Sequence, residues 1–179
     1  CYDDPNDLRF VSGGNSHFFR YYLGNYFGMV KAGTGETYSI SLVFSEVYLN
    51  KAEALAMLGR TDEAIETLQK LRENRMTDAG TINLTGEDLV KFIRAERRRD
   101  LCFMGQRWFD LKRYAVHPKY PQKTRIEHPY YTWTGSSAIL EKTYVLEEYP
   151  SDGGWLLPFP KDALTSNDGV LKDNIRPER

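Results

Sequence analysis

Two helix-forming stretches separated by a short turn that contains a glycine constrain the fold of this chain most. Residues 42–58, LVFSEVYLNKAEALAML, carry apolar side chains around nearly the whole helical circumference, which predicts a buried helix. Gly59 suits the left-handed position that follows a helix. Residues 62–76, DEAIETLQKLRENRM, place an apolar face on a second helix. Because only two or three residues join the two helices, they should form an antiparallel hairpin.

The helix pair resembles one tetratricopeptide unit over residues 52–71. Small residues stand at the expected helix crossing, and DEAI opens the second helix, which Thr61 or Asp62 should cap. No second copy follows at the spacing of about 34 residues that such arrays need. One unit cannot bury both of its faces, so other helices must cover it. We expect a mainly α fold in which tetratricopeptide-like helix pairs pack with irregular loops and a few short strands.

The remaining chain divides into segments of different character. Residues 1–40 predict loops with one or two strands around HFFRYYL, and Thr85 with Asp88 should open a third helix over 86–104. Gly105 should end that helix before a shorter one over 106–115. We expect residues 42–114 to form a helical core and residues 115–179 a region of loops and strands, with one strand at KTYVLEEY (142–149). Together, residues 1–179 should form a single domain.

Composition excludes several classes of function. The net charge of −1 gives no overall attraction to nucleic acid or anionic lipid. No apolar run approaches the roughly 18 residues that a membrane-spanning helix requires. Cys1 and Cys102 lack metal-ligand spacing, and the three histidines are scattered. We therefore expect no metal site, no cofactor and no nucleic-acid partner, and we expect Cys102 to be a buried free thiol.

The densest charge in the chain lies in ERRRDLCFMGQRWFDLKRY, residues 96–114. On a helical wheel Glu96 and Asp100 fall within the apolar face, and Arg97 and Arg99 flank it. Lys91, Arg94 and Arg98 point away from it. In the first helix the polar exceptions Glu46, Asn50 and Glu53 form one stripe at 100° per residue.

Three interpretations of residues 96–114 follow. A nucleic-acid surface would turn its arginines outward with few acids between them, unlike this pattern. Glu96 and Asp100 resemble an acid/base pair of a glycosidase, but such pairs usually face each other across a cleft. An internal ion-pair network fits best, because buried carboxylates need cations, and arginine suits that role. The expected network comprises Glu46, Glu53, Glu96, Arg97, Arg99, Asp100, Arg107, Asp110 and Arg113.

An internal network makes its members necessary for folding. Asp100→Ala or Arg107→Ala should leave an uncompensated buried charge and prevent soluble folding, measured as soluble yield after expression. A stable, well-folded Arg107→Ala protein would contradict the network.

Three ordered blocks carry a family resemblance: SEVYLNKAEALAMLGRTDEAIETLQKLRENR, IRAERRRDLCFMGQRWFDLKRY and LLPFPKDALTSNDGVLKDN. Together they resemble the C-terminal part of SusD/RagB-family nutrient-binding outer-membrane lipoproteins, over most of residues 40–175. The chain departs from the pattern at Val43–Phe44, where an arginine is usual. It also has Asn167–Asp168–Gly169 in place of Asn-Pro, and Lys172–Asp173–Asn174 in place of the Gln-Asn ending.

The resemblance implies a non-catalytic protein at the extracellular face of the outer membrane. Such proteins capture glycans or peptides and pass them to a TonB-dependent (SusC-like) transporter, and a lipid on an N-terminal cysteine anchors them. Cys1 matches that anchor, but the helices that should follow it are missing. We therefore expect a C-terminal fragment of a longer protein, with Cys1 as a truncation point.

Sugar-binding residues do not follow from the family motifs, so candidates come from physical chemistry. Sugars stack their apolar faces on exposed aromatic rings. Tyr130, Tyr131 and Trp133, expected in a loop, are the first candidates, with Trp155 and residues 15–27 behind them. The alternative is that these rings pack the loop against the helices. Two other functions stay open: a tetratricopeptide-like scaffold for a protein partner, chiefly the transporter, and a glycoside-active enzyme.

Overall fold

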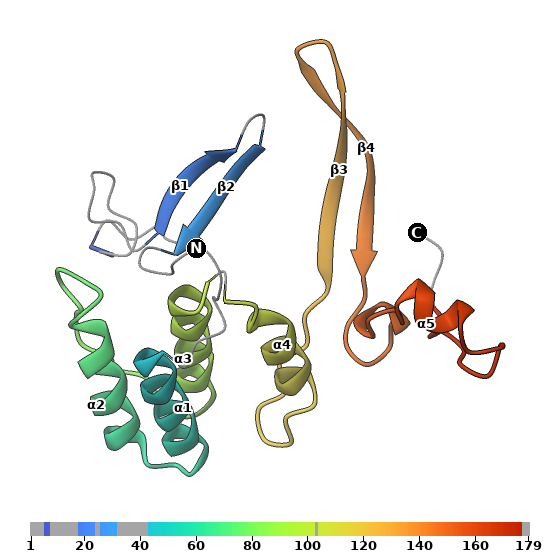
Figure 1. Cartoon of the computed structure of the whole chain (residues 1–179). Coiled ribbons are helices and arrows are strands. Elements are labelled where there is room, and N and C mark those ends of the chain that lie inside the picture. Colours follow the sequence, from blue (N-terminus) through green and yellow to red (C-terminus); the bar gives the residue numbers. More distant parts are fainter. Residues whose placement is uncertain (1–5, 8–17, 24–25, 32–42, 103, 177–179) are drawn as a thin grey trace. The chain divides into compact units, whose positions relative to one another are not determined.

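The computed structural model describes residues 6–7, 18–23, 26–31, 43–102 and 104–176 (Figure 1). The chain divides into two compact units, Cys1–Trp108 and Phe109–Arg179. Helices dominate the described residues, and the strands form two-stranded antiparallel pairs. The prediction of a mainly α fold with a few short strands is confirmed. The single-domain organisation and the boundary between residues 114 and 115 stay predictions.

Helices α1 (Phe44–Met57) and α2 (Thr61–Arg72) form the predicted hairpin. Leu58 ends α1, and Gly59 follows with φ +77°. The Gly59 amide donates to the Ala56 carbonyl and the Arg60 amide donates to the Leu55 carbonyl, a Schellman arrangement that closes the helix end. The chain reverses there, and α1 packs against α2 (Figure 1).

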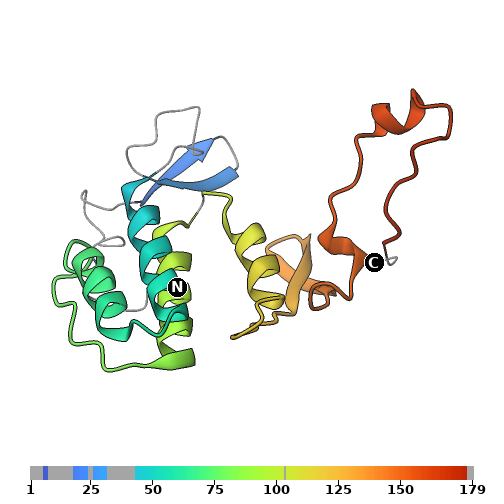
Figure 2. The same cartoon turned by 90° about the horizontal axis from the view of Figure 1, so that it is seen from below.

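Helix α3 (Gly86–Asp100) covers a second side of α1, so that α1 lies between two helices (Figure 2). Leu49, Ala52 and Ala56 of α1 are buried, as are Ala64 and Leu68 of α2 and Leu89, Val90 and Ile93 of α3. The prediction that α1 is buried on all sides is wrong. Phe44, Val47 and Leu58 are exposed, because the described helices pack against two sides of α1 and leave this one open.

Two helix boundaries differ from the sequence prediction. Helix α2 begins at Thr61 with Arg60 at its N-cap, and neither Thr61 nor Asp62 caps it. The Arg60 guanidinium instead pairs with Glu63 at 2.5 Å. Helix α3 ends at Asp100, before the predicted residue 104, and Leu101 caps it. The chain turns there and reaches Gly105, whose φ of +73° suits the predicted break.

Strands β1 (Phe18–Leu23) and β2 (Tyr26–Lys31) pair antiparallel in the first unit, which confirms a strand at HFFRYYL. Other residues of the candidate surface 15–27 lie outside the described residues, as does Cys1. Asp7 forms an isolated antiparallel bridge with Met76.

The second unit contains most of α4 (Arg107–Ala115), whose first residues belong to the first unit. A long hairpin follows, made of β3 (Ile126–Thr134) and β4 (Ser137–Leu146) (Figure 1). Gly135 and Ser136 join the strands, and Gly135 has φ +63°. Glycine with positive φ at the first position of a two-residue turn is typical of type II′ hairpins. The predicted strand at 142–149 therefore begins earlier and ends at Leu146.

The end of the second unit is held by a few polar contacts around the short helices η2 (Gly153–Trp155) and α5 (Lys161–Thr165). The Asp152 carboxylate accepts from the amides of Glu147 and Gly154 at 3.0 and 2.7 Å. The Asp173 carboxylate accepts from the Phe159 amide at 3.1 Å, and this bond is the largest cause that lowers the pKa of Asp173.

Within the described residues, no helix is long and apolar enough to cross a bilayer, and no group of His, Cys, Asp and Glu side chains could hold a metal ion.

Gly59 provides a test of the α1–α2 turn. A Cβ at Gly59 would meet no atom within 4 Å, so Gly59→Ala costs only the strain of a left-handed backbone. We expect Gly59→Ala to lower the free energy of unfolding by about 1 kcal/mol, measured by urea denaturation. Gly59→Asn is the matched control and should lose less, since asparagine tolerates this conformation. Equal losses for both variants would contradict a left-handed backbone at Gly59.

Candidate functional site

The β3–β4 hairpin displays the three aromatic candidates on a strand, not in a loop as expected. The two-residue turn at Gly135–Ser136 is short enough for Tyr130, Tyr131 and Trp133 to remain in β3. Their exposed fractions are 42%, 49% and 72%, so these rings do not pack a loop against the helices. Trp133 is the most open of them and offers its ring for stacking.

The strand register separates these rings onto two faces. Tyr131 pairs with Leu140 and Trp133 with Ala138, and directly opposed residues share a face of a sheet. We call these four residues the Trp133 face. Pro129 precedes Tyr131 by two positions, so both residues lie on the same face of β3. Thr143 pairs with Pro129, which places the Thr143 hydroxyl on the Trp133 face as well. The Trp133 face therefore combines two aromatic rings, an apolar side chain and a hydroxyl group.

Tyr130 lies on the opposite face of the hairpin. It pairs with Lys142, and its ring meets that of Tyr144 edge-on at 6.0 Å between centroids. The Lys142 ammonium lies 4.2 Å from the centroid of the Tyr144 ring. A register shift between Tyr130 and Tyr131 marks a β-bulge and brings Leu140, not Glu141, opposite Tyr131. Tyr130 therefore cannot form one platform with Trp133.

Charged residues join the strands at the base of the hairpin. Arg125 donates to Glu147 of the returning chain at 3.1 Å and also to Glu127. The hydrogen bond to Glu147 is the main cause that raises the pKa of Arg125. Because these side chains are exposed to solvent, the contacts orient the base of the hairpin and contribute little stability.

Trp155, the fourth aromatic candidate, is 1% exposed. Its indole nitrogen donates to the Glu147 carbonyl at 2.6 Å, and its ring meets the Tyr149 ring edge-on. A buried ring has no free face for a sugar, so the expectation that Trp155 binds sugar is wrong. Trp155 follows the Gly153–Gly154 pair, where the chain makes a tight turn. The carbonyl of Ile175 lies 2.1 Å from where a Cβ of Gly153 would stand, so the C-terminal segment covers this turn.

The second candidate cluster lies in the first unit, where α3 presents cations to α1. Arg97 donates to Glu46 at 3.2 Å and to the Asn50 amide oxygen at 2.6 Å. Arg94 pairs with Glu53 at 3.2 Å, and both side chains are buried. The Glu46, Asn50 and Glu53 stripe of α1 therefore meets two arginines of α3.

Helix α3 presents anions to α2 and to the turn that follows α2. Glu96 pairs with Arg72 at 2.9 Å and with Arg99 of its own helix at 2.5 Å. Asp100 pairs with Arg75 at 2.7 Å. Glu96 is 1% exposed and Asp100 is 0% exposed, so substrate cannot reach them. These contacts argue against the interpretation of Glu96 and Asp100 as a catalytic pair.

The remaining predicted members, Arg107, Asp110 and Arg113, belong to α4. Asp110 pairs with Arg113 one turn away on α4, at 3.0 Å. Arg107 stands half-buried at the start of α4. The structure therefore brings six of the nine residues together between α1, α2 and α3: Glu46, Glu53, Glu96, Arg97, Arg99 and Asp100.

Sequence reasoning missed three arginines of this cluster. The prediction that Arg94 points away from the apolar face is wrong, because α1 covers the side of α3 that carries Val90, one turn before Arg94. The expected network also omits Arg72 and Arg75, which pair with Glu96 and Asp100. Arg72 lies one turn after the buried Leu68, so its inward position could have been found from the helical wheel.

Comparison with known proteins identifies the family of this chain. The SusD family model matches residues 12–176, so the chain belongs to the SusD family. Members of this family are generally binding proteins without catalytic activity. SusD-like protein P38 from Formosa agariphila is 41% identical over 86 residues, which cover 44% of this chain and 17% of that protein. The match thus spans about a sixth of the relative's length. No solved structure matches the chain.

The buried pairs provide a test with a matched control on the same helix. Arg94→Ala leaves Glu53 buried without its guanidinium partner, and we expect the free energy of unfolding to fall by about 3–5 kcal/mol. Lys91→Ala removes a lysine from the exposed Lys91–Glu87 pair and should leave the free energy of unfolding almost unchanged, because solvent screens this pair. Urea denaturation followed by circular dichroism measures both. Similar losses in the two variants would contradict a stabilising role for the buried pair.

Proposed function

We propose that this chain is part of a nutrient-binding protein that captures oligosaccharides on the Trp133 face. The exposed row of Tyr131 and Trp133, with Leu140 beside it, carries this proposal. Aromatic rings on one side of a strand offer stacking surfaces, and residues two apart in a strand lie about 7 Å from each other. The rings are thus spaced for neighbouring parts of an extended ligand, and the Thr143 hydroxyl can hydrogen-bond to sugar hydroxyl groups.

The proposed mechanism is capture and release without chemical change. Family membership supports hand-off of the ligand to a TonB-dependent (SusC-like) outer-membrane transporter. It also supports a location at the extracellular face of the outer membrane, where a lipid anchor on the full-length protein holds it. Because Glu96 and Asp100 are buried and paired with arginines, they support no hydrolytic role.

A second candidate function is a tetratricopeptide-like scaffold for a protein partner. The open side of α1 favours it, because Phe44, Val47 and Leu58 are 78%, 55% and 72% exposed. Large apolar side chains gathered on one surface mark sites where another protein binds. This function and sugar capture use different units of the chain, and both can operate in one protein.

Tryptophan fluorescence tests sugar capture directly. Titration with maltoheptaose, xylohexaose and chitohexaose should change the emission of the exposed Trp133 with at least one of them. Trp133→Ala should weaken that binding by about 2 kcal/mol or more, roughly 30-fold in Kd, measured by calorimetry. The matched control, Tyr130→Ala, lies on the opposite face and should leave Kd unchanged.

Three results would count against the proposal. Equal losses in the two variants would remove the Trp133 face as the site. Absence of binding to any sugar would favour the scaffold function. Shortened products detected by chromatography would restore the enzyme interpretation.

A further inference from the structure

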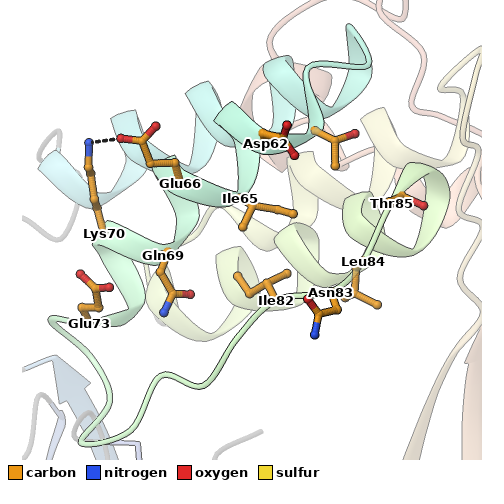
Figure 3. Close-up of a pocket in the computed structure, with 11 residues that line it drawn as sticks. Asp62, Ile65, Glu66, Gln69, Lys70, Glu73, Ile82, Asn83, Leu84 and Thr85 are labelled. Carbon is orange, nitrogen blue, oxygen red and sulfur yellow. Dashed lines mark hydrogen bonds and ion pairs between the residues drawn. The ribbon is translucent and has the colours of Figure 1, made fainter.

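A groove runs along α2 in the first unit, whereas the sugar candidates belong to the second unit. It has a volume of about 590 Å³ and lies between α2 and the segment that leads into α3 (Figure 3). One wall is the α2 face from Thr61 to Glu73, and the other is residues 82–85. Ile65 and Ile82 point toward each other at its centre, as Figure 3 shows. The groove therefore has an apolar middle between two polar rims.

The segment at residues 81–85, which contains this wall, has the character of an unpaired strand. Burial alternates along it: Ile82 is buried and Leu84 half-buried, while Thr81, Asn83 and Thr85 are exposed. Such alternation is typical of an extended chain. The backbone groups of residues 82–84 form no hydrogen bond with any other residue that the structure describes. The Gln69 side chain holds the segment in place by donating to the Gly80 carbonyl at 2.9 Å.

The rim on α2 is acidic. Asp62, Glu66 and Glu73 line the groove against a single cation, Lys70. Lys70 is bound to Glu66 at 2.7 Å, and this hydrogen bond is the largest cause that lowers the pKa of Glu66. Within the described residues, Asp62 forms no ion pair. The groove thus carries an excess of negative charge that Lys70 does not neutralise.

We propose that this groove binds an extended basic peptide segment of a partner protein, which adds as a strand along residues 82–84. The free amides and carbonyls of this wall supply the hydrogen bonds of strand addition. The carboxylates attract Lys or Arg side chains, whose aliphatic stems cover Ile65 and Ile82. The α2 wall extends over about 18 Å, the length of roughly five extended residues.

A peptide fits this groove better than an amino sugar does. None of the residues that line it is aromatic, so it offers no stacking surface for a sugar ring. A row of backbone groups, by contrast, matches another backbone. The proposal does not rest on sugar capture by the hairpin, and either can fail without the other.

Fluorescence anisotropy with the full chain tests the proposal. The probe is the labelled peptide Lys-Val-Lys-Val-Lys, and Glu-Val-Glu-Val-Glu is the control peptide. We expect only the basic peptide to bind, more weakly as salt rises. The variant Asp62→Asn with Glu73→Gln should bind it roughly five- to tenfold more weakly. Glu141→Gln with Asp168→Asn removes the same charge from the other unit and should leave Kd unchanged.

Hydrogen exchange separates strand addition from general charge attraction. On addition of the basic peptide, exchange of the amides of residues 82–84 should slow, while the exposed end of the β3–β4 hairpin stays unchanged. Equal binding of both peptides, equal loss in both double variants, or unprotected amides at 82–84 would overturn the proposal. Displacement of the peptide by an equal concentration of the glucosamine disaccharide would reassign the groove to an amino sugar.

Discussion

The arrangement of the three helices depends on the two opposite stripes of charge along α3. Arg94 and Arg97 face the carboxylates of α1, while Glu96 faces Arg72 of α2 and Asp100 faces Arg75 just after α2. Because α1 and α2 carry opposite signs toward α3, exchanging their places would bring like charges together. Buried ion pairs add little stability compared with apolar residues of equal size. A buried charge without its partner, however, lowers the free energy of unfolding strongly. We infer that the network fixes which helix lies where, while Leu49, Leu68 and Ile93 provide the hydrophobic stability.

This core leaves two surfaces of the first unit without cover from the described residues. One is the apolar side of α1 and the other is the acidic groove on α2. Both lie on the tetratricopeptide-like pair, an element whose two faces need partners. The second unit is different, because its hairpin stands out with both faces exposed. Separate units thus present separate surfaces.

Sequence reasoning succeeded where local rules decide the structure. Gly59 predicted the turn between α1 and α2, because glycine adopts a left-handed backbone with almost no steric cost. It failed on the hairpin, where Tyr130, Tyr131 and Trp133 were assigned to a loop. A Gly-Ser pair between two runs rich in β-branched and aromatic residues was the available signal. It failed on Arg94 because a wheel drawn for one helix does not show which sides its neighbours cover.

The sequence by itself determined the helix pair, the mainly α class and the SusD resemblance, since these depend on residue order and local periodicity. The tertiary structure alone decided which residues are accessible. It left Trp155 only 1% exposed and Trp133 72% exposed. It also paired Arg72 and Arg75 with acids 24 and 25 residues away. Accessibility and distant pairing depend on packing in three dimensions, which no short stretch of sequence encodes.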